Sequence, residues 1–249
     1  MKRFLHGAKL AIALSASALS ATLPSALASL PAQPEPLLLS QSVNFQPPNV
    51  TAPGGRQGGT HRGSKLCPAG LSITPLVPPT NIGLTLTESP TIFVYLPQTS
   101  AEIEFTLLTE NEDKVVYEKT FKVDKSGIVG IAIPASSDSN KSLEVGKRYV
   151  WSFSMVCEPE DRSADLVTKG FVQRIEPQPN LKSDLVANPD PMTRLDVYAK
   201  NGIWYETLAT LAQMRRQTPG DARLNAKWTQ LLESQGLESV AAQPLVGPL

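Results

Sequence analysis

Histidine is scarce in this sequence, which has only two in 249 residues. His6 lies near the start, and His61 lies in a segment rich in glycine. A Ser-His-Asp or Cys-His arrangement needs a histidine beside its nucleophile, and an HExxH zinc site needs two. A G-x-S-x-G motif is also missing. These absences exclude the common catalytic and zinc sites, and we predict a protein that is not an enzyme, with no catalytic, metal-binding or cofactor-binding residue.

The chain also lacks an excess of charge of either sign, since 23 basic residues stand against 23 acidic ones. Such a balance gives no reason to expect nucleic acid or an anionic membrane surface as a partner. Beyond residue 28 no apolar run approaches the roughly 20 residues that cross a bilayer. We therefore expect no membrane span in the mature protein.

Residues 1–28 have the features of a secretory signal peptide in their usual order. Basic residues up to Lys9 are followed by an uncharged run at 10–23 and then by Ala26-Leu27-Ala28. The alternative is a membrane anchor, but about fourteen apolar residues are too few to span a bilayer. We predict cleavage after Ala28 and a soluble chain in the periplasm or outside the cell.

Two cysteines, Cys67 and Cys157, remain in the exported chain. An even number of cysteines outside the cytoplasm indicates a disulfide first. It would close a loop of about 90 residues, for which the chain-entropy model gives up to roughly 4–5 kcal/mol. A pair of free thiols and a metal site are the alternatives, the latter disfavoured because histidines to complete it are lacking.

Composition divides the mature chain into zones. Residues 29–66 are rich in proline and glycine and predict a flexible tether. Residues 67–176 contain short runs typical of strands, the clearest at 103–107, 115–123 and 148–157. In the last of these, every second residue from Tyr149 to Cys157 is large and apolar. The pattern predicts a mainly β domain, an antiparallel β-sandwich with a hairpin around the polar turn 110–113.

The segment 143–151 resembles the entry to the sixth strand of an immunoglobulin or fibronectin type III-like domain. In such domains a tyrosine hydroxyl bonds back to the preceding corner, and Tyr149 stands at that place. The alternative is that Tyr149 only starts a buried strand.

Residues 180–238 have helical periodicity, with predicted helices at 191–200, 203–217 and 219–235. Gly202 and Gly236 lie 34 positions apart, the length of a tetratricopeptide repeat, so a small tetratricopeptide-like helical hairpin is expected. An ordinary helical hairpin is the alternative. Residues 239–249 are expected to form a flexible C-terminus.

Three aromatic residues of this helical tail are candidates for an interaction surface: Tyr198, Tyr205 and Trp228. Tyr198 and Trp228 lie on the helices that would line the concave face of a repeat stack. Tyr205 lies off the apolar stripe of its own helix. The alternative is that the tail packs on the sandwich and is structural.

The segment 158–165 is the one dense acidic cluster. Asp161, Ser163 and Asp165 alternate as in a calcium loop, but Leu166 replaces the glycine and Val172 the bidentate glutamate of that motif. A solvated loop between two strands is the favoured interpretation. Cation binding by this loop stays open.

Several motifs, in this order along the chain, resemble a family of exported cyanobacterial proteins, the domain of unknown function 928. They lie at 67–68, 74–78, 83–86, 90–97, 143–153, 157–163 and 198–206. The resemblance covers most of the chain from Cys67 to about Gly236. It implies a periplasmic or secreted location in a Gram-negative-type envelope, and it implies no activity.

We therefore expect an exported, non-catalytic protein-interaction or scaffolding module whose partner is another envelope or periplasmic protein. The alternative is a domain that binds envelope polysaccharide or hydrolyses it with a pair of carboxylates.

Overall fold

The structure, a computed structural model, describes residues 42–56, 64, 66–136 and 142–247. The chain separates into two units, Met1–Leu37 and Leu38–Leu249, and all described residues belong to the second. The predicted signal peptide lies outside the described residues. Eight strands precede the helices in the described part of the chain: β1 (Thr74–Pro75), β2 (Ile82–Thr85), β3 (Thr91–Leu96), β4 (Ile103–Thr109), β5 (Val115–Phe121), β6 (Gly127–Ala132), β7 (Arg148–Met155) and β8 (Leu166–Arg174).

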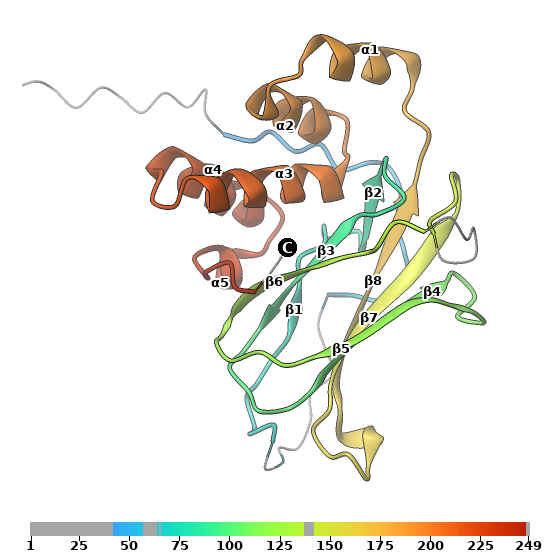
Figure 1. The fold of residues 1–249 in the computed structure, drawn as a ribbon, viewed down its shortest axis with the longest axis vertical. Coiled ribbons are helices and arrows are strands. Elements are labelled where there is room, and N and C mark those ends of the chain that lie inside the picture. Colours follow the sequence, from blue (N-terminus) through green and yellow to red (C-terminus); the bar gives the residue numbers. More distant parts are fainter. Residues whose placement is uncertain (1–41, 57–63, 65, 137–141, 248–249) are drawn as a thin grey trace, which may run out of the picture. The chain divides into compact units, whose positions relative to one another are not determined.

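The strands form two sheets, one of three strands in the order β1-β3-β6 and one of five in the order β2-β8-β7-β4-β5 (Figure 1). The expectation of a mainly β domain is confirmed. The prediction that all strands pair in antiparallel fashion is wrong for one pair of strands, because β2 runs parallel to β8 with Ile82 opposite Phe171. A parallel pair requires a long crossover, and here strands β3 to β7 lie between the two partners in the chain.

The alternating pattern of the central strands matches the way the five-stranded sheet is buried. In β4, Ile103, Phe105 and Leu107 are buried while the residues between them are half-buried. The same face of β7 carries Trp151 and Phe153, which lie opposite Leu107 and Phe105. The predicted hairpin is confirmed, since β4 pairs with β5 in antiparallel register.

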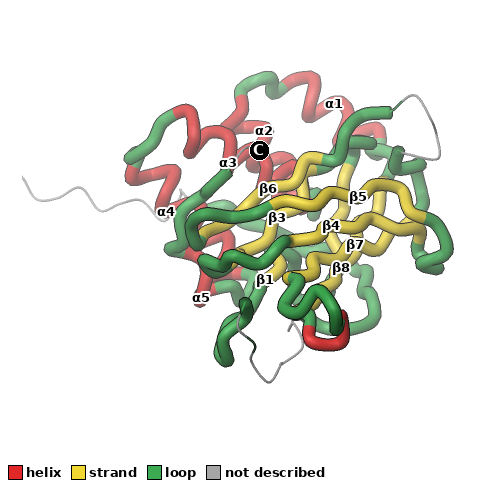
Figure 2. The backbone as a smooth tube through the Cα atoms, turned by 60° about the horizontal axis from the view of Figure 1, so that its bottom comes forward, coloured by secondary structure: helices red, strands yellow, loops and turns green. Residues whose placement is uncertain are grey.

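The three-stranded sheet is covered on both faces. Val94 and its neighbour Val129 share the face turned to the five-stranded sheet, while Phe93 on the opposite face meets the ring of Trp228 at 6.4 Å. Figure 2 shows the helices gathered along one side of the strands. The continuous apolar runs of β3 and β6 follow from this double burial, which leaves no solvent-facing row for polar residues.

Five helices follow: α1 (Pro179–Ala187), α2 (Pro191–Lys200), α3 (Trp204–Gln217), α4 (Ala222–Ser234) and α5 (Glu238–Ala241). The Asp190 carboxylate accepts the N–H of Thr193 at 3.0 Å and begins α2 at the predicted position. α3 contacts both α2 and α4 and also packs on β2 and β3. The helical tail is thus an integral part of the core. No helix in the described part of the chain is long and apolar enough to cross a membrane.

The predicted tether is wrong for residues 42–56, which pack on the domain. Phe45 is buried and meets Trp204 edge-to-face at 4.9 Å. The Arg56 guanidinium donates to the Gln235 carbonyl at 2.6 Å. Proline and glycine limit the regular structure of this segment, but its few apolar side chains still find places in the core.

The predicted flexible C-terminus is likewise wrong for residues 239–247. They complete α5, and Leu245 then forms a parallel bridge to Ile128 at the edge of β6. A short segment without periodicity carries no local sign that a free strand edge will bind it.

Candidate binding groove at the edge of β6

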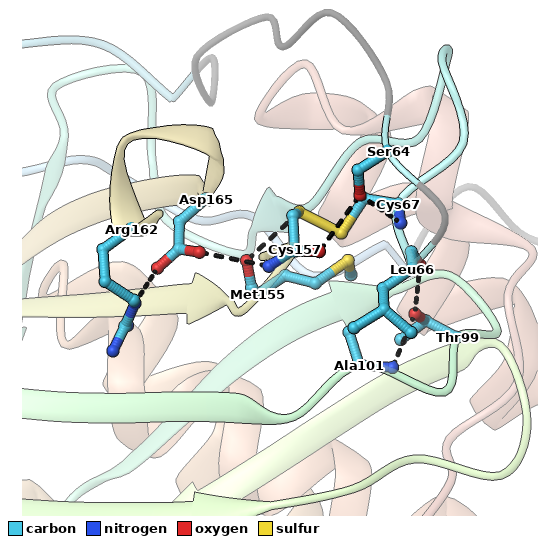
Figure 3. The surroundings of a disulfide bond; sticks show 9 residues. All are labelled: Ser64, Leu66, Cys67, Thr99, Ala101, Met155, Cys157, Arg162 and Asp165. Carbon is cyan, nitrogen blue, oxygen red and sulfur yellow. Dashed lines mark hydrogen bonds and ion pairs between the residues drawn. A yellow bond between two sulfur atoms is a disulfide. The ribbon is translucent and has the colours of Figure 1, made fainter. Parts of the chain in front are cut away.

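The predicted disulfide is confirmed: Cys67 and Cys157 are bonded, with Cα atoms 5.3 Å apart (Figure 3). It joins the segment before β1 to the end of β7. The Ser64 hydroxyl donates to the Cys157 carbonyl at 3.1 Å and accepts the N–H of Cys67 at 3.1 Å. This corner fastens the first strand to the five-stranded sheet.

The two aspartates of the acidic segment 158–165 have protein partners. Asp165 accepts the N–H of Cys157 at 3.1 Å and a hydrogen bond from Arg162 at 2.7 Å (Figure 3). Arg162 also forms a two-pronged contact with Glu104 on β4. Asp161 caps the short 3-10 helix Arg162–Ala164 by accepting hydrogen bonds from the hydroxyl and the N–H of Ser163, and these bonds lower the pKa of Asp161. The segment therefore ties the end of β7 to the neighbouring strand.

Two of the three proposed surface aromatics are buried, so their assignment to an interaction surface is wrong. Trp228 is wholly enclosed, with its ring against Phe93 and under the Arg215 guanidinium at 4.9 Å. The Tyr205 hydroxyl accepts the Trp151 indole N–H at 2.8 Å and donates to the Phe171 carbonyl at 2.9 Å. Both side chains hold the helices on the sheets.

Tyr198, the third candidate, is half-buried in a small apolar cluster around Leu181 and Ile203. Burial raises the pKa of its hydroxyl. The Tyr198 side chain is therefore only partly accessible to a partner.

Glu206, in the first turn of α3, is an acid whose carboxylate reaches the end of β2. One carboxylate oxygen accepts the Thr85 hydroxyl at 2.7 Å and the N–H groups of Leu86 and Thr87 at 2.8 and 3.1 Å. The other oxygen is shielded from solvent and has no partner among the described residues. Burial raises the pKa of Glu206, although the three hydrogen bonds lower it. This carboxylate holds the end of β2 on α3, a structural role.

A groove lies between the edge strands β5 and β6, with a volume of about 360 Å³. We name it the β5–β6 groove. Its floor is apolar and is formed by Phe121, Val123, Val129, Ile131 and Val246. Its rim carries Lys119, Lys122 and Lys125, with Asp124 as the one acid. Three lysines against one aspartate make the groove electropositive.

Two of the rim lysines have no ion pair in the part of the chain that the structure describes. Lys122 lies 3.9 Å from Glu102, a long contact between exposed groups, whereas Lys119 and Lys125 have none. Lys119 also lies opposite Phe105, on the face of β5 that turns toward the core. Its aliphatic part borders the groove while its ammonium group stays in solvent.

The edge of β6 beside this groove is partly paired. The Ile128 N–H donates to the Pro244 carbonyl at 2.7 Å, and the Val246 N–H donates to the Ile128 carbonyl at 2.9 Å. Outward-pointing groups alternate along a strand, so the N–H and C=O of Gly130 and Ala132 point the same way as those of Ile128. No described residue bonds to them.

Among the described residues, segment 244–247 forms backbone hydrogen bonds with Ile128 of β6 alone. The carbonyls of Val246 and Gly247 are taken by Arg216 of α3, at 3.4 and 2.5 Å. Within the described part of the chain, the edge thus binds one short segment and leaves the outward groups of Gly130 and Ala132 unpaired.

A second groove, of about 490 Å³, borders the same edge on its helical side. We name it the α3–β6 groove; its lining comes from β3, β6 and α3 and comprises Thr91, Phe93, Ala132, Ala209, Gln213, Arg216 and Gln217. The free part of β6 therefore has a groove on each side.

This edge was not predicted from the sequence, although one signal for it was present. The apolar alternation Val115, Tyr117, Phe121, Val123 is interrupted by Lys119, a charge at a position where the pattern requires an apolar residue. An inward-facing lysine is typical of a sheet edge. The described residues contain no cluster of metal-binding side chains, and His61 lies outside them.

The comparisons with known proteins identify a family and nothing closer. The family model described as Domain of Unknown Function (DUF928) matches residues 57–245. No curated protein and no solved structure matches the chain.

Proposed function

Since the chain belongs to the family described as Domain of Unknown Function (DUF928), whose description names no activity, we propose its function from the geometry of the described residues: it is a non-catalytic module that binds a partner protein in the β5–β6 groove. The observation that carries the proposal is the apolar, lysine-rimmed groove beside unpaired strand groups. Apolar floors with a charged rim are the usual anatomy of a protein-binding site. The role suits a scaffold, because the sheets and helices around the groove form a single core.

The proposal includes export, with cleavage after Ala28 and a partner in the periplasm or outside the cell. The order of features in residues 1–28 supports it. The Cys67–Cys157 bond supports it independently, since disulfides persist in oxidising compartments. The intact mass of the exported protein should correspond to a chain that starts at Ser29. A full-length chain in the membrane fraction would refute this part.

The proposal also includes a finer fold assignment. Two stacked sheets and a hydrogen bond from the Glu144 N–H to the Tyr149 hydroxyl, at 2.9 Å, support a relation to immunoglobulin and fibronectin type III-like sandwiches. The 34-residue spacing of Gly202 and Gly236, both with positive φ at helix ends, supports a tetratricopeptide-like hairpin. Both architectures commonly serve binding.

The test compares partner capture by three forms of the exported protein. The groove variant carries Lys119→Glu and Lys125→Glu, and its matched control carries Lys182→Glu and Lys200→Glu on α1 and α2. All four side chains are exposed, and both variants change the net charge equally. We expect the same envelope protein to be captured by the wild type and the control but not by the groove variant. Equal capture by all three, or capture of polysaccharide alone, would overturn the proposal.

A further inference from the structure

The free edge of β6 and its two flanking grooves together fit one kind of occupant. We propose that the partner segment is an extended, acidic peptide that adds to β6 as a further strand, with its main chain bonded to Gly130 and Ala132. This inference rests on the proposed function and names the chemistry of the partner that the β5–β6 groove binds.

The main-chain groups along β6 alternate in direction and leave places for an added strand. Ile128 already uses its outward N–H and C=O to bind the segment 244–246. Gly130 and Ala132 present the same pair of groups to the same side, and no described residue takes them. The edge therefore accepts a strand in this structure, and its unoccupied part continues in the same direction. An added strand obtains affinity from such main-chain bonds.

The two grooves determine which side chains of the peptide fit. Successive residues of an extended strand point to opposite faces of a sheet. A peptide on β6 therefore directs one set of side chains toward the floor of the β5–β6 groove, at Phe121, Val129 and Ile131. The other set faces the α3–β6 groove, where Phe93 and Ala132 adjoin Arg216. Aliphatic residues at every second position would fill the first groove.

The charges around the groove favour an acidic peptide. Lys119, Lys122 and Lys125 surround the groove, and Asp124 is the one acid in its lining. Lys122 has a long ion pair with Glu102 at 3.9 Å, whereas Lys119 and Lys125 have no ion pair with a described residue. Carboxylates that flank the aliphatic positions of the peptide would meet these ammonium groups. Lysines also protect sheet edges from unwanted pairing. If the lysines only protect the edge, they give an acidic strand no advantage. If they recognise the partner, an acidic strand should bind better than a basic one.

The position of the groove favours a single extended chain over a rigid folded surface as the occupant. The space is a groove of about 360 Å³ that follows the gap between two edge strands. A single extended chain can follow β6 between the two grooves while its backbone reaches Gly130. Segment 244–247 shows this mode of approach, since the close contact requires glycine at 127: a Cβ there would lie 2.7 Å from the Pro244 carbonyl oxygen.

The experiment measures peptide binding to the full exported chain by fluorescence anisotropy. The probe is a labelled nonapeptide in which valine alternates with glutamate, compared with the same peptide carrying lysine for glutamate. We expect the glutamate peptide to bind and the lysine peptide not to bind. The double variant Lys119→Glu with Lys125→Glu should weaken binding about tenfold or more, because two exposed attractions become repulsions. The control Lys182→Glu with Lys200→Glu should bind within about twofold of the wild type, since exposed charges elsewhere contribute little.

Strand addition is tested separately from charge. Ala132→Pro removes one outward N–H on an edge strand, where proline is tolerated, and Ala132→Ser keeps it. We expect the proline variant to lose at least about tenfold in affinity and the serine variant to keep it, because a main-chain bond and its close approach are lost. Hydrogen exchange at Gly130 and Ala132 should slow in the wild-type complex. A peptide whose backbone nitrogens are methylated at alternate residues tests strand addition without altering the protein.

The outcomes separate the inference from the proposed function. If an envelope protein is captured through the groove but neither peptide binds, or N-methylation changes nothing, strand addition by an acidic segment is wrong and the proposed function stands. If the groove variant captures every partner, the proposed function itself is wrong. Concentration-dependent dimers that Ala132→Pro abolishes would show that a second copy of this chain occupies the edge, and would overturn the inference.

Discussion

Replacing Tyr205 by phenylalanine should destabilise the protein strongly, although the change removes a single oxygen atom. The Tyr205 hydroxyl accepts the Trp151 N–H at 2.8 Å and donates to the Phe171 carbonyl at 2.9 Å. Trp151 and Tyr205 are both essentially inaccessible to solvent. Neither water nor another described side chain can replace the lost acceptor without a rearrangement of the core.

The magnitude follows from the two bonds. A buried donor without a partner costs about 1–3 kcal/mol, and loss of the hydroxyl–carbonyl bond adds about 0.5–1.5 kcal/mol. We therefore expect Tyr205→Phe to lower the free energy of unfolding by about 2–4 kcal/mol. Tyr198→Phe is the matched control, because the half-buried Tyr198 hydroxyl forms no hydrogen bond with a described residue. It should change stability by less than about 0.5 kcal/mol.

The assay is urea unfolding followed by tryptophan fluorescence and far-ultraviolet circular dichroism. All three tryptophans are buried, so the fluorescence reports on this core directly. The midpoint should move while the slope with denaturant stays constant, which identifies a change in stability and not in compactness. A loss below about 1 kcal/mol at unchanged slope would refute the reasoning, as would equal losses for the two tyrosine variants.

Three further predictions concern the disulfide, Glu206 and Gly83. Replacing Cys67 and Cys157 together by serine should cost up to about 4–5 kcal/mol, because the bond spans 90 residues; denaturant titration checks this, and an unchanged midpoint would contradict it. Burial raises the pKa of Glu206 above its ordinary value of 4.5, so the folded state holds the proton more tightly than the unfolded state does. The contribution of Glu206 to stability should therefore be fully present below that ordinary value and be lost as the pH rises through the raised pKa. Glu206→Gln should remove this part of the pH dependence in thermal melts, and an equal dependence in both forms would refute the assignment. Gly83→Ala would place its Cβ 2.7 Å from the Tyr205 ring and should cost about 1–3 kcal/mol by overpacking; a melting temperature equal to that of the wild type would show that the contact relaxes freely.

Most elements could be located from local periodicity. The alternation in 103–107 and 148–157 corresponds to β4 and β7, and the Asp190-Pro191 start corresponds to the first residue of α2. These signals are local, because each depends on which face of one element meets the core. The cysteine pair was also predictable, since a chain with two cysteines has only one possible intramolecular disulfide.

Other features depended on contacts between distant residues. Tyr205 lies beside the apolar stripe of Trp204, Leu208 and Leu211, so periodicity alone left its burial open. α3 lies between a sheet and other helices and is covered on a wider face than a surface helix. That environment buries Tyr205 and supplies Trp151, 54 residues earlier in the chain, as the donor to its hydroxyl.

The β5–β6 groove was also predictable only in part from the sequence. The sequence by itself determined that residues 115–121 form a strand and that Lys119 interrupts its apolar face. It did not determine that β5 and β6 end up as the facing edges of two different sheets, or that residues 244–247 would pair with one of them. Strand order and edge pairing depend on which main-chain groups remain unbonded after the whole chain has folded, and no local pattern records that.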